Sequence, residues 1–184
     1  PEAIPLDNER RRGFVKNSIL EPLFFKDIPG VFPNANPDLL LKTLELLSGT
    51  VGSTFQFQQM TEVLGCSHPV IATQVEILCK SLVVSQLFNY TPSIIKQKRT
   101  AKKIIFTDNG ILNILNPEKE NGILAENLVG NTIEATHFWR DSEGREIDFL
   151  LPEKKIAIEV KYQEHISSGD EKHMEHFLKE HPGW

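Results

Sequence analysis

The sequence predicts an α+β protein in which a helical part precedes a part built on strands. Apolar residues recur at helical spacing from residue 38 to residue 80. Short apolar runs separated by turn residues then follow, up to residue 162. The charge also divides the chain, because residues 1–105 hold 12 Lys and Arg against 9 Asp and Glu, whereas residues 106–184 hold 8 against 16. This split predicts two functional parts, with any affinity for nucleic acid resting mainly on the first.

The composition is that of a soluble chain. Its 184 residues, 40% of them hydrophobic, are enough for one sizeable core or two small ones. The apolar runs are far shorter than the roughly 18 residues that suggest a membrane span, and no signal peptide is visible. Cys66 and Cys79 have no CxxC partner, so we expect reduced thiols rather than zinc ligands or a disulfide. A cytoplasmic protein without a membrane partner is expected.

Residues 1–37 are expected to form a helical N-terminal connector. Leu20, Leu23 and Phe24 fit a helix face. An irregular segment is expected after it, since a proline interrupts helical hydrogen bonding and three prolines follow at positions 29, 33 and 37.

Residues 38–106 have the pattern of a winged helix. Leu40, Leu44 and Leu47 are spaced for one buried helix face, and a second stripe runs from residue 57 to Gly65, which ends it. A tight turn at residues 65–67 then leads to a third helix over residues 69–80. Two strands, 82–88 and 103–106, bracket a basic loop. Three helices followed by a two-stranded hairpin predict a winged helix-turn-helix.

The basic loop favours nucleic-acid binding as one candidate function of this domain. In that arrangement the third helix lies in the major groove and the loop contacts phosphates. The candidate nucleic-acid-binding residues are Lys80, Lys96, Lys98, Arg99 and Lys102. The outward positions of the third helix hold no other cation to pair with a guanine or a phosphate. Because winged helices also bind proteins, a protein-contact function stays open.

Residues 107–184 predict a second, strand-rich domain. A short helix at 111–115 and another starting near residue 122 precede three strands, 134–140, 146–151 and 156–162. Turns with the sequences DSEG and PEKK join the strands, and a helix over residues 169–180 follows them.

Charged residues interrupt the last two strands in a pattern that suits a metal site. Glu159 and Lys161 project to the same side of one strand, and Asp148 lies on the strand before it. Two nearby carboxylates bind Mg²⁺ or Mn²⁺, and a neighbouring lysine can orient an attacking water. Glu126, on the preceding helix, is a candidate third carboxylate. The alternative is a solvated strand face carrying a surface ion pair worth less than about 1 kcal/mol.

The spacing D-x10-E-x-K after a helix with a glutamate resembles the PD-(D/E)xK restriction-endonuclease-like superfamily. Six stretches occur in the order seen in the C-terminal part of a prokaryotic AAA-type ATPase family, which the chain resembles over almost its whole length. They are FFKDIPG, the helix-turn-helix, KKIIFTDNGIL, NGILAENLV, HFWRDSEGREIDFLL and IAIEVK. In that family a P-loop ATPase domain precedes a winged helix and a nuclease-like domain of unknown function.

The resemblance implies a chain that follows an ATPase domain, its partner in cis. The sequence contains no GxxxxGK[ST], so we expect no ATP site and no ATPase activity in this chain. It begins at Pro1 rather than methionine, as expected of a fragment. It ends at Trp184, where a restriction-endonuclease-like core would begin a later strand, so that domain is expected to be small or truncated.

Two functions follow from these patterns. The first is a Mg²⁺- or Mn²⁺-dependent nuclease acting on phosphodiesters, with Asp148 and Glu159 as metal ligands, Lys161 positioning water and Glu126 assisting. The second is a non-catalytic module that binds DNA, a protein partner or a second copy of the chain.

Overall fold

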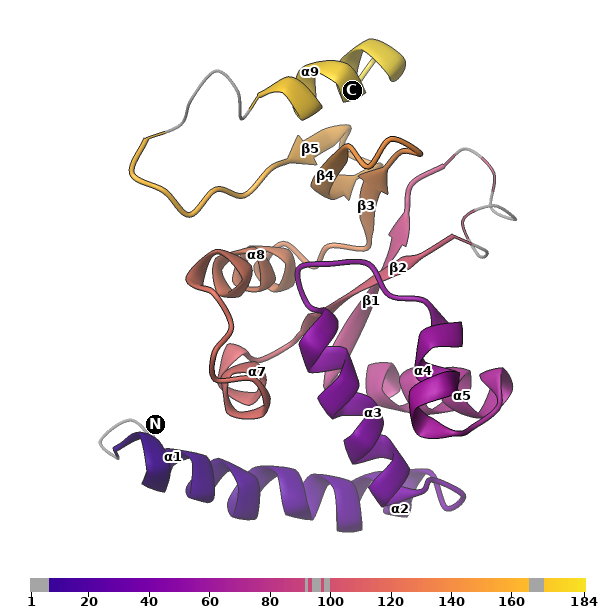
Figure 1. The fold of residues 1–184 in the computed structure, drawn as a ribbon, viewed down its shortest axis with the longest axis vertical. Coiled ribbons are helices and arrows are strands. Elements are labelled where there is room, and N and C mark those ends of the chain that lie inside the picture. The colour runs from indigo at the N-terminus through magenta and orange to yellow at the C-terminus, as the bar shows by residue number, and fades with distance from the viewer. Residues whose placement is uncertain (1–6, 92, 94–96, 98–99, 166–170) are drawn as a thin grey trace.

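A computed structural model describes residues 7–91, 93, 97, 100–165 and 171–184. It confirms the α+β class, since helices surround one mixed sheet with the strand order β2-β1-β3-β4-β5 (Figure 1). The elements of the first part are α1 (Asn8–Val15), α2 (Ile28–Val31), α3 (Pro37–Thr50), α4 (Phe57–Leu64), α5 (His68–Lys80), β1 (Val84–Asn89) and β2 (Lys102–Phe106). Those of the second are α7 (Asn109–Leu115), α8 (Asn121–Thr132), β3 (His137–Arg140), β4 (Glu146–Leu151), β5 (Ile156–Ile158) and α9 (Lys172–Glu180).

The N-terminal segment is helical for longer than expected. Helical structure runs from α1 to α2 as one rod at the bottom of Figure 1, so the irregular segment expected at Pro29 is wrong. Two π-helical turns, Lys16–Leu20 and Leu23–Asp27, come just before Pro22 and Pro29. A π-turn widens the helix, which relieves the clash that a proline ring makes with an earlier carbonyl. The irregular segment begins only after Val31.

The winged-helix arrangement forms as the helical spacing predicts. Gly65 ends α4 with a left-handed φ of 64°, and the turn that follows leads into α5. β1 and β2 form an antiparallel hairpin, in which Val84 pairs with Phe106. Phe55 adds a further bridge, since its N–H and carbonyl both bond to the backbone of Lys102, at 2.8 and 3.3 Å. This bridge fixes the helices to the outer edge of the hairpin.

The strands of the second part are shorter than expected. Glu134 has a φ of 51°, which favours a turn, and β3 therefore begins only at His137 rather than at residue 134. β5 ends at Ile158 rather than at residue 162. The turns between these strands lie where the sequence predicts them, at residues 141–144 and 152–155.

One sheet extends through both parts. β1 pairs with β3 in parallel through Phe88 and Asn89, so the sheet crosses the expected domain boundary between residues 106 and 107. That boundary stays a prediction. α8 and α9 lie on opposite sides of β3, β4 and β5 (Figure 1). Each packs on its own apolar cluster, one around Phe138 and Phe149 and the other around Trp139 and Phe177.

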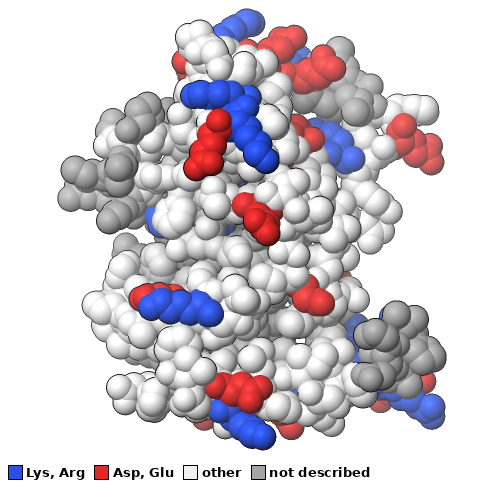
Figure 2. Space-filling view, turned by 180° about the vertical axis from the view of Figure 1, so that it is seen from behind, with Lys and Arg blue, Asp and Glu red and all other residues white. Residues whose placement is uncertain are grey.

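The surface carries charges of both signs. Figure 2 shows the face turned away in Figure 1, where acidic and basic side chains lie in small mixed groups on a mainly uncharged surface. Within the described part of the chain, no helix combines the length and the apolar character needed to cross a membrane.

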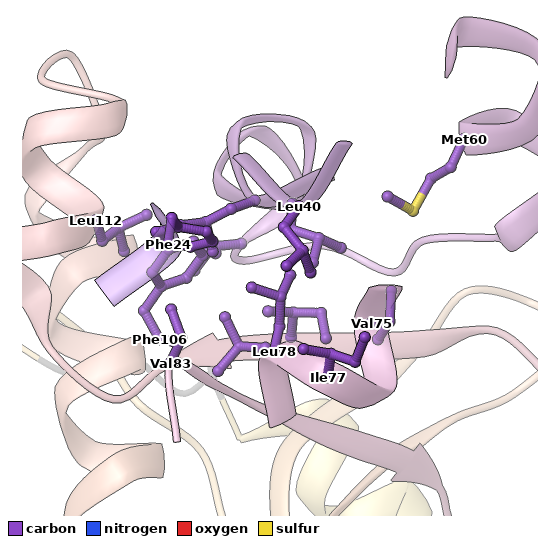
Figure 3. Close-up of a cluster of buried hydrophobic side chains, with 14 of the residues drawn as sticks. Phe24, Leu40, Met60, Val75, Ile77, Leu78, Val83, Phe106 and Leu112 are labelled. Atoms are coloured by element: carbon purple, nitrogen blue, oxygen red, sulfur yellow. The ribbon is translucent and has the colours of Figure 1, made fainter. Parts of the chain in front are cut away.

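The largest apolar cluster joins the helices of the first part to the sheet. Figure 3 shows Phe24 of the N-terminal rod beside Leu112 of α7 and above Phe106 of β2. Leu40 and Leu78 belong to the same cluster and, like Phe24, are fully buried. The N-terminal rod is therefore part of the hydrophobic core.

Candidate active site

The helix α8 is held close to the sheet, and this brings Glu126 to its candidate position. The Asn127 side chain accepts a hydrogen bond from the Phe106 N–H (2.7 Å) and donates one to the Phe106 carbonyl (2.8 Å). A Cβ on Gly130 would lie only 2.5 Å from the Phe149 ring, so only glycine lets the helix approach this strand without a shift. Glu126 is one turn before Gly130 and shares its face of the helix.

A β-bulge in β4 aims Asp148 at the same place. Between the pairs His137–Leu150 and Trp139–Ile147, β3 advances by two residues and β4 by three, so β4 carries one extra residue. The extra residue lets Asp148 and Phe149 both face α8, although successive residues of a regular strand face opposite ways. A bulge of this kind redirects a side chain, and here the redirected side chain is a carboxylate.

Three carboxylates surround the ammonium group of Lys103, which comes from β2. The Lys103 Nζ lies 2.5 Å from Glu146 Oε1, 2.9 Å from Glu126 Oε1 and 3.9 Å from Asp148 Oδ1. The Lys103 side chain is only 2% exposed. We call these four residues the acid–lysine cluster. Glu146 has a second cationic partner outside the cluster, because its other carboxylate oxygen pairs with the half-exposed Arg140 at 2.9 Å.

The cluster changes the acidity of its members. Burial raises the pKa of Glu126, and the Lys103 ammonium only partly offsets that effect. Burial also raises the pKa of Asp148, where the Val160 N–H works in the opposite direction and the Glu159 carboxylate adds to the rise. Burial alone would lower the pKa of Lys103, but the Glu126 and Glu146 carboxylates outweigh it and raise that pKa. The ion pairs therefore outweigh burial for Lys103 and keep it charged. For Glu126 burial outweighs the ion pair.

Glu159 and Lys161 follow the end of β5, on the segment whose Val160 contacts Asp148. The Val160 N–H donates to Asp148 Oδ2 at 2.8 Å, which fixes the carboxylate against the segment that carries both residues. The Lys161 ammonium pairs with Glu159 Oε1 at 2.7 Å. The other carboxylate oxygen of Glu159 is buried and has no hydrogen-bond partner among the described residues. A buried acceptor of this kind is costly unless a ligand or an ion satisfies it.

The predicted site residues are thus close together in the fold, but the sequence did not reveal two neighbours. Asp148 and Glu126 share the acid–lysine cluster, while Glu159 and Lys161 form a pair next to it. Lys103 and Glu146 were not predicted. A lysine inside the buried strand KKIIF was the available signal for the first, and the alternation of Glu146 with Asp148 along β4 for the second.

The candidate nucleic-acid-binding lysines lie elsewhere. Lys80 is exposed and pairs with Glu76 at 2.6 Å on the same helix. Lys102 is buried and donates to the backbone carbonyls of Gln97 and Thr100. Lys96, Lys98 and Arg99 lie outside the described residues. The assignment of these five residues to nucleic acid stays a prediction.

Two family comparisons divide the chain near the start of α8. Residues 1–122, two thirds of the chain, match a family described as a domain of unknown function (DUF8612). The chain belongs to this DUF8612 family. Residues 120–183 match a second domain of unknown function (DUF4143). Lys103 thus lies in the DUF8612 match, and the three carboxylates of the acid–lysine cluster lie in the DUF4143 match. Neither a curated protein nor a solved structure matches the chain.

Proposed function

We propose that this DUF8612 chain is the C-terminal region of an AAA-type ATPase and that it carries a metal-dependent nuclease-like site. The observation that carries the nuclease proposal is the bond from the Val160 N–H to Asp148, which holds Asp148 against the segment of Glu159, together with the buried Glu159 oxygen that has no partner among the described residues. The DUF4143 match supports the ATPase link, since this domain is found in C-terminal regions associated with AAA-type ATPases.

The donor set suits Mg²⁺ or Mn²⁺. Asp148 and Glu159 offer hard carboxylate oxygens, and the Glu159 oxygen without a partner is available to a cation. Within the described residues, no group of three or more His, Cys, Asp or Glu side chains is arranged to hold a metal ion. Mg²⁺ is commonly held by one or two carboxylates together with waters and substrate phosphates, so a pair of carboxylates is compatible with its chemistry.

The residues of the chain then have separate roles in phosphodiester hydrolysis. A bound divalent cation supplies Lewis-acid stabilisation of the phosphate charge. Asp148 and Glu159 hold the cation, and the Val160 N–H keeps Asp148 in place. Lys161, held by Glu159, positions the attacking water. Glu126 assists from α8, where its raised pKa suits proton transfer.

A cleavage assay tests this proposal. Plasmid and single-stranded oligonucleotides are incubated with the protein and Mg²⁺ or Mn²⁺, and we expect cleavage that Asp148→Asn reduces to the level of a protein-free control. The asparagine oxygen still accepts from the Val160 N–H, so this variant removes the charge and keeps the bond. Glu153→Gln, at an exposed turn carboxylate, is the matched control and should cleave like the wild type. Equal cleavage by wild type and Asp148→Asn would refute the nuclease proposal.

The second candidate is a non-catalytic module that binds DNA or a protein partner. The acid–lysine cluster favours it, because Lys103 already neutralises part of the carboxylate charge that a metal would use. In that case we expect no cleavage and no heat on titration with Mn²⁺. Salt-dependent duplex binding that weakens when Lys96, Lys98 and Arg99 are neutralised would identify DNA as the partner.

A further inference from the structure

The Lys103 side chain connects two parts of the chain that are distant in sequence. Lys103 belongs to β2, at the edge of the sheet, and pairs through its backbone with Leu87 of β1. Its ammonium group lies 5.7 Å from the centre of the Phe138 ring and reaches carboxylates on α8 and β4. A residue of the winged-helix hairpin thus completes the charge arrangement beside the candidate metal ligands.

The position does not need a lysine for packing. Its neighbours in the same layer include Leu87, Ile105 and Phe138, all of them buried apolar side chains. An apolar residue would fill this space without the cost of burying a charge, which is high unless the charge is paired. Lys161 does not take over the role, because it pairs with Glu159. The feature that a lysine adds at this position is a fixed positive charge among three carboxylates.

We infer that Lys103 is a positioning residue of the site: its ammonium group is the built-in cation of Glu126, Glu146 and Asp148, so that a divalent ion is bound only at Asp148 and Glu159, where one carboxylate oxygen has no partner among the described residues. This inference rests on the proposed function for the role of that ion. The ammonium holds Glu126 and Glu146 together at 2.9 and 2.5 Å and lies 3.9 Å from Asp148, whose other oxygen accepts from the Val160 N–H. Without it, Glu146 would keep its pair with Arg140, but Glu126 and Asp148 would lose the ammonium and would attract a further divalent ion into the space that Lys103 leaves.

The test removes the positive charge of Lys103 and measures whether a metal ion binds in its place. Lys103→Met keeps a long apolar stem and removes the ammonium, whereas Lys103→Arg keeps a positive charge. Each protein is titrated with Mn²⁺ by calorimetry and melted with Mn²⁺ or with EDTA. For Lys103→Met we expect one Mn²⁺ more than in the wild type and a rise in Tm of about 5–10 °C when Mn²⁺ is about 100-fold above its Kd.

The matched controls isolate the charge. Lys103→Arg should show the Mn²⁺ response of the wild type, and so should Lys42→Met, which removes an exposed lysine of α3. A lysine that served only in packing would give a destabilised Lys103→Met protein that Mn²⁺ does not stabilise. If Lys103→Met folds only when Mn²⁺ is present, the inference is supported. If Lys103→Met folds neither with Mn²⁺ nor with EDTA, the same titration is made on the double variant Lys103→Met/Glu146→Gln. This variant has one negative charge fewer to compensate, and its result decides.

The outcomes separate this inference from the proposed function. A folded Lys103→Met protein or double variant that gains no Mn²⁺ overturns the role of Lys103, even if the wild type binds Mn²⁺ and cleaves DNA. A double variant that stays unfolded with Mn²⁺ also overturns it. If the wild type neither binds Mn²⁺ nor cleaves DNA but the Lys103→Met protein gains Mn²⁺, Lys103 is still the built-in cation. The nuclease proposal is then rejected.

Discussion

Two regions of the molecule, the winged-helix arrangement of residues 38–106 and the strands and helices around the acid–lysine cluster, are stabilised by different interactions. The core of the first is built from apolar side chains such as Leu40, Leu44 and Leu78, all fully buried. The second contains the ions of the acid–lysine cluster and the amide of Asn127, which is 1% exposed and bonds to the Phe106 backbone. Apolar burial gains free energy in proportion to area and tolerates many partners, whereas buried ions require particular partners. The stability of the first region therefore depends mainly on how its apolar side chains fill the core. The stability of the second depends on the charge and geometry of its buried polar groups.

The largest effect is expected from the apolar core. Phe24→Ala removes a fully buried ring that packs on the main cluster, and we expect a loss of about 3–5 kcal/mol in the free energy of unfolding. Phe25→Ala is the matched control, because Phe25 is 53% exposed and the loss of its ring should change stability little. Urea denaturation of both variants measures the difference. Similar midpoints for the two variants would mean that the N-terminal rod does not belong to the core.

A smaller effect is expected where α8 approaches β4. In Gly130→Ala the new methyl group would lie 2.5 Å from the buried Phe149 ring, so the ring and the bulge beside Asp148 must shift. We expect a net loss of about 1–2 kcal/mol, since overpacking costs about 1–3 kcal/mol and alanine favours a helix over glycine by up to about 1 kcal/mol. Gly13→Ala, with no atom within 4 Å of its new Cβ, should gain stability. Chemical denaturation compares the two, and a stabilised Gly130→Ala protein would contradict the close contact.

The buried charge of Glu126 predicts a pH dependence. Because burial raises the pKa of Glu126 in the folded state, the folded protein binds that proton more tightly than the unfolded chain does. The resulting stability is present below the ordinary pKa of a glutamate and is lost as the pH rises through the raised value. We therefore expect the stability of the wild type relative to Glu126→Gln to fall as the pH rises from about 4, the ordinary pKa of a glutamate, through the raised value. Urea denaturation across this range measures it, with Glu153→Gln as a control whose difference from the wild type should stay constant. A relative stability that rises with pH would show that Lys103 outweighs burial.

The smallest effect is expected at the surface of the winged helix. Lys80 and Glu76 form an exposed pair at i and i+4, and such pairs contribute about 0.3–0.5 kcal/mol. Lys80→Ala should therefore change the free energy of unfolding by less than about 0.5 kcal/mol, an effect that disappears in high salt. Thermal melts at low and high salt check this. A loss above about 1 kcal/mol would assign Lys80 a structural role that its exposure does not suggest.

The sequence predicted those parts of the fold that follow from local spacing. Leu40, Leu44 and Leu47 recur at helical spacing, and Gly65 ends a helix because it adopts a left-handed conformation more readily than other residues. The rod through Pro22 and Pro29 was missed, since π-turns have no simple apolar period.

The sequence indicates some residues of the candidate site, but not its arrangement and not the neighbours Lys103 and Glu146. Asp148, Glu159 and Lys161 interrupt apolar runs, which is visible in the sequence. The bulge that turns Asp148 toward α8 depends on the register between β3 and β4, and register is a property of the sheet rather than of one strand. Lys103 lies 23 residues from Glu126 and 43 from Glu146, so only the folded chain places these three side chains together.

The origin of Lys103 in β2 also limits how this protein can have been assembled during evolution. The lysine and its three carboxylates lie in segments that match two different families, so each segment carries charges that the other must balance. A gene fusion that exchanged one segment for an unrelated one would leave either the Lys103 ammonium or the Glu126 carboxylate without its buried ionic partner, a change that costs about 3–5 kcal/mol. The two segments are therefore constrained to be inherited as a pair, and substitutions at Lys103 should be accompanied by substitutions at Glu126 or Glu146.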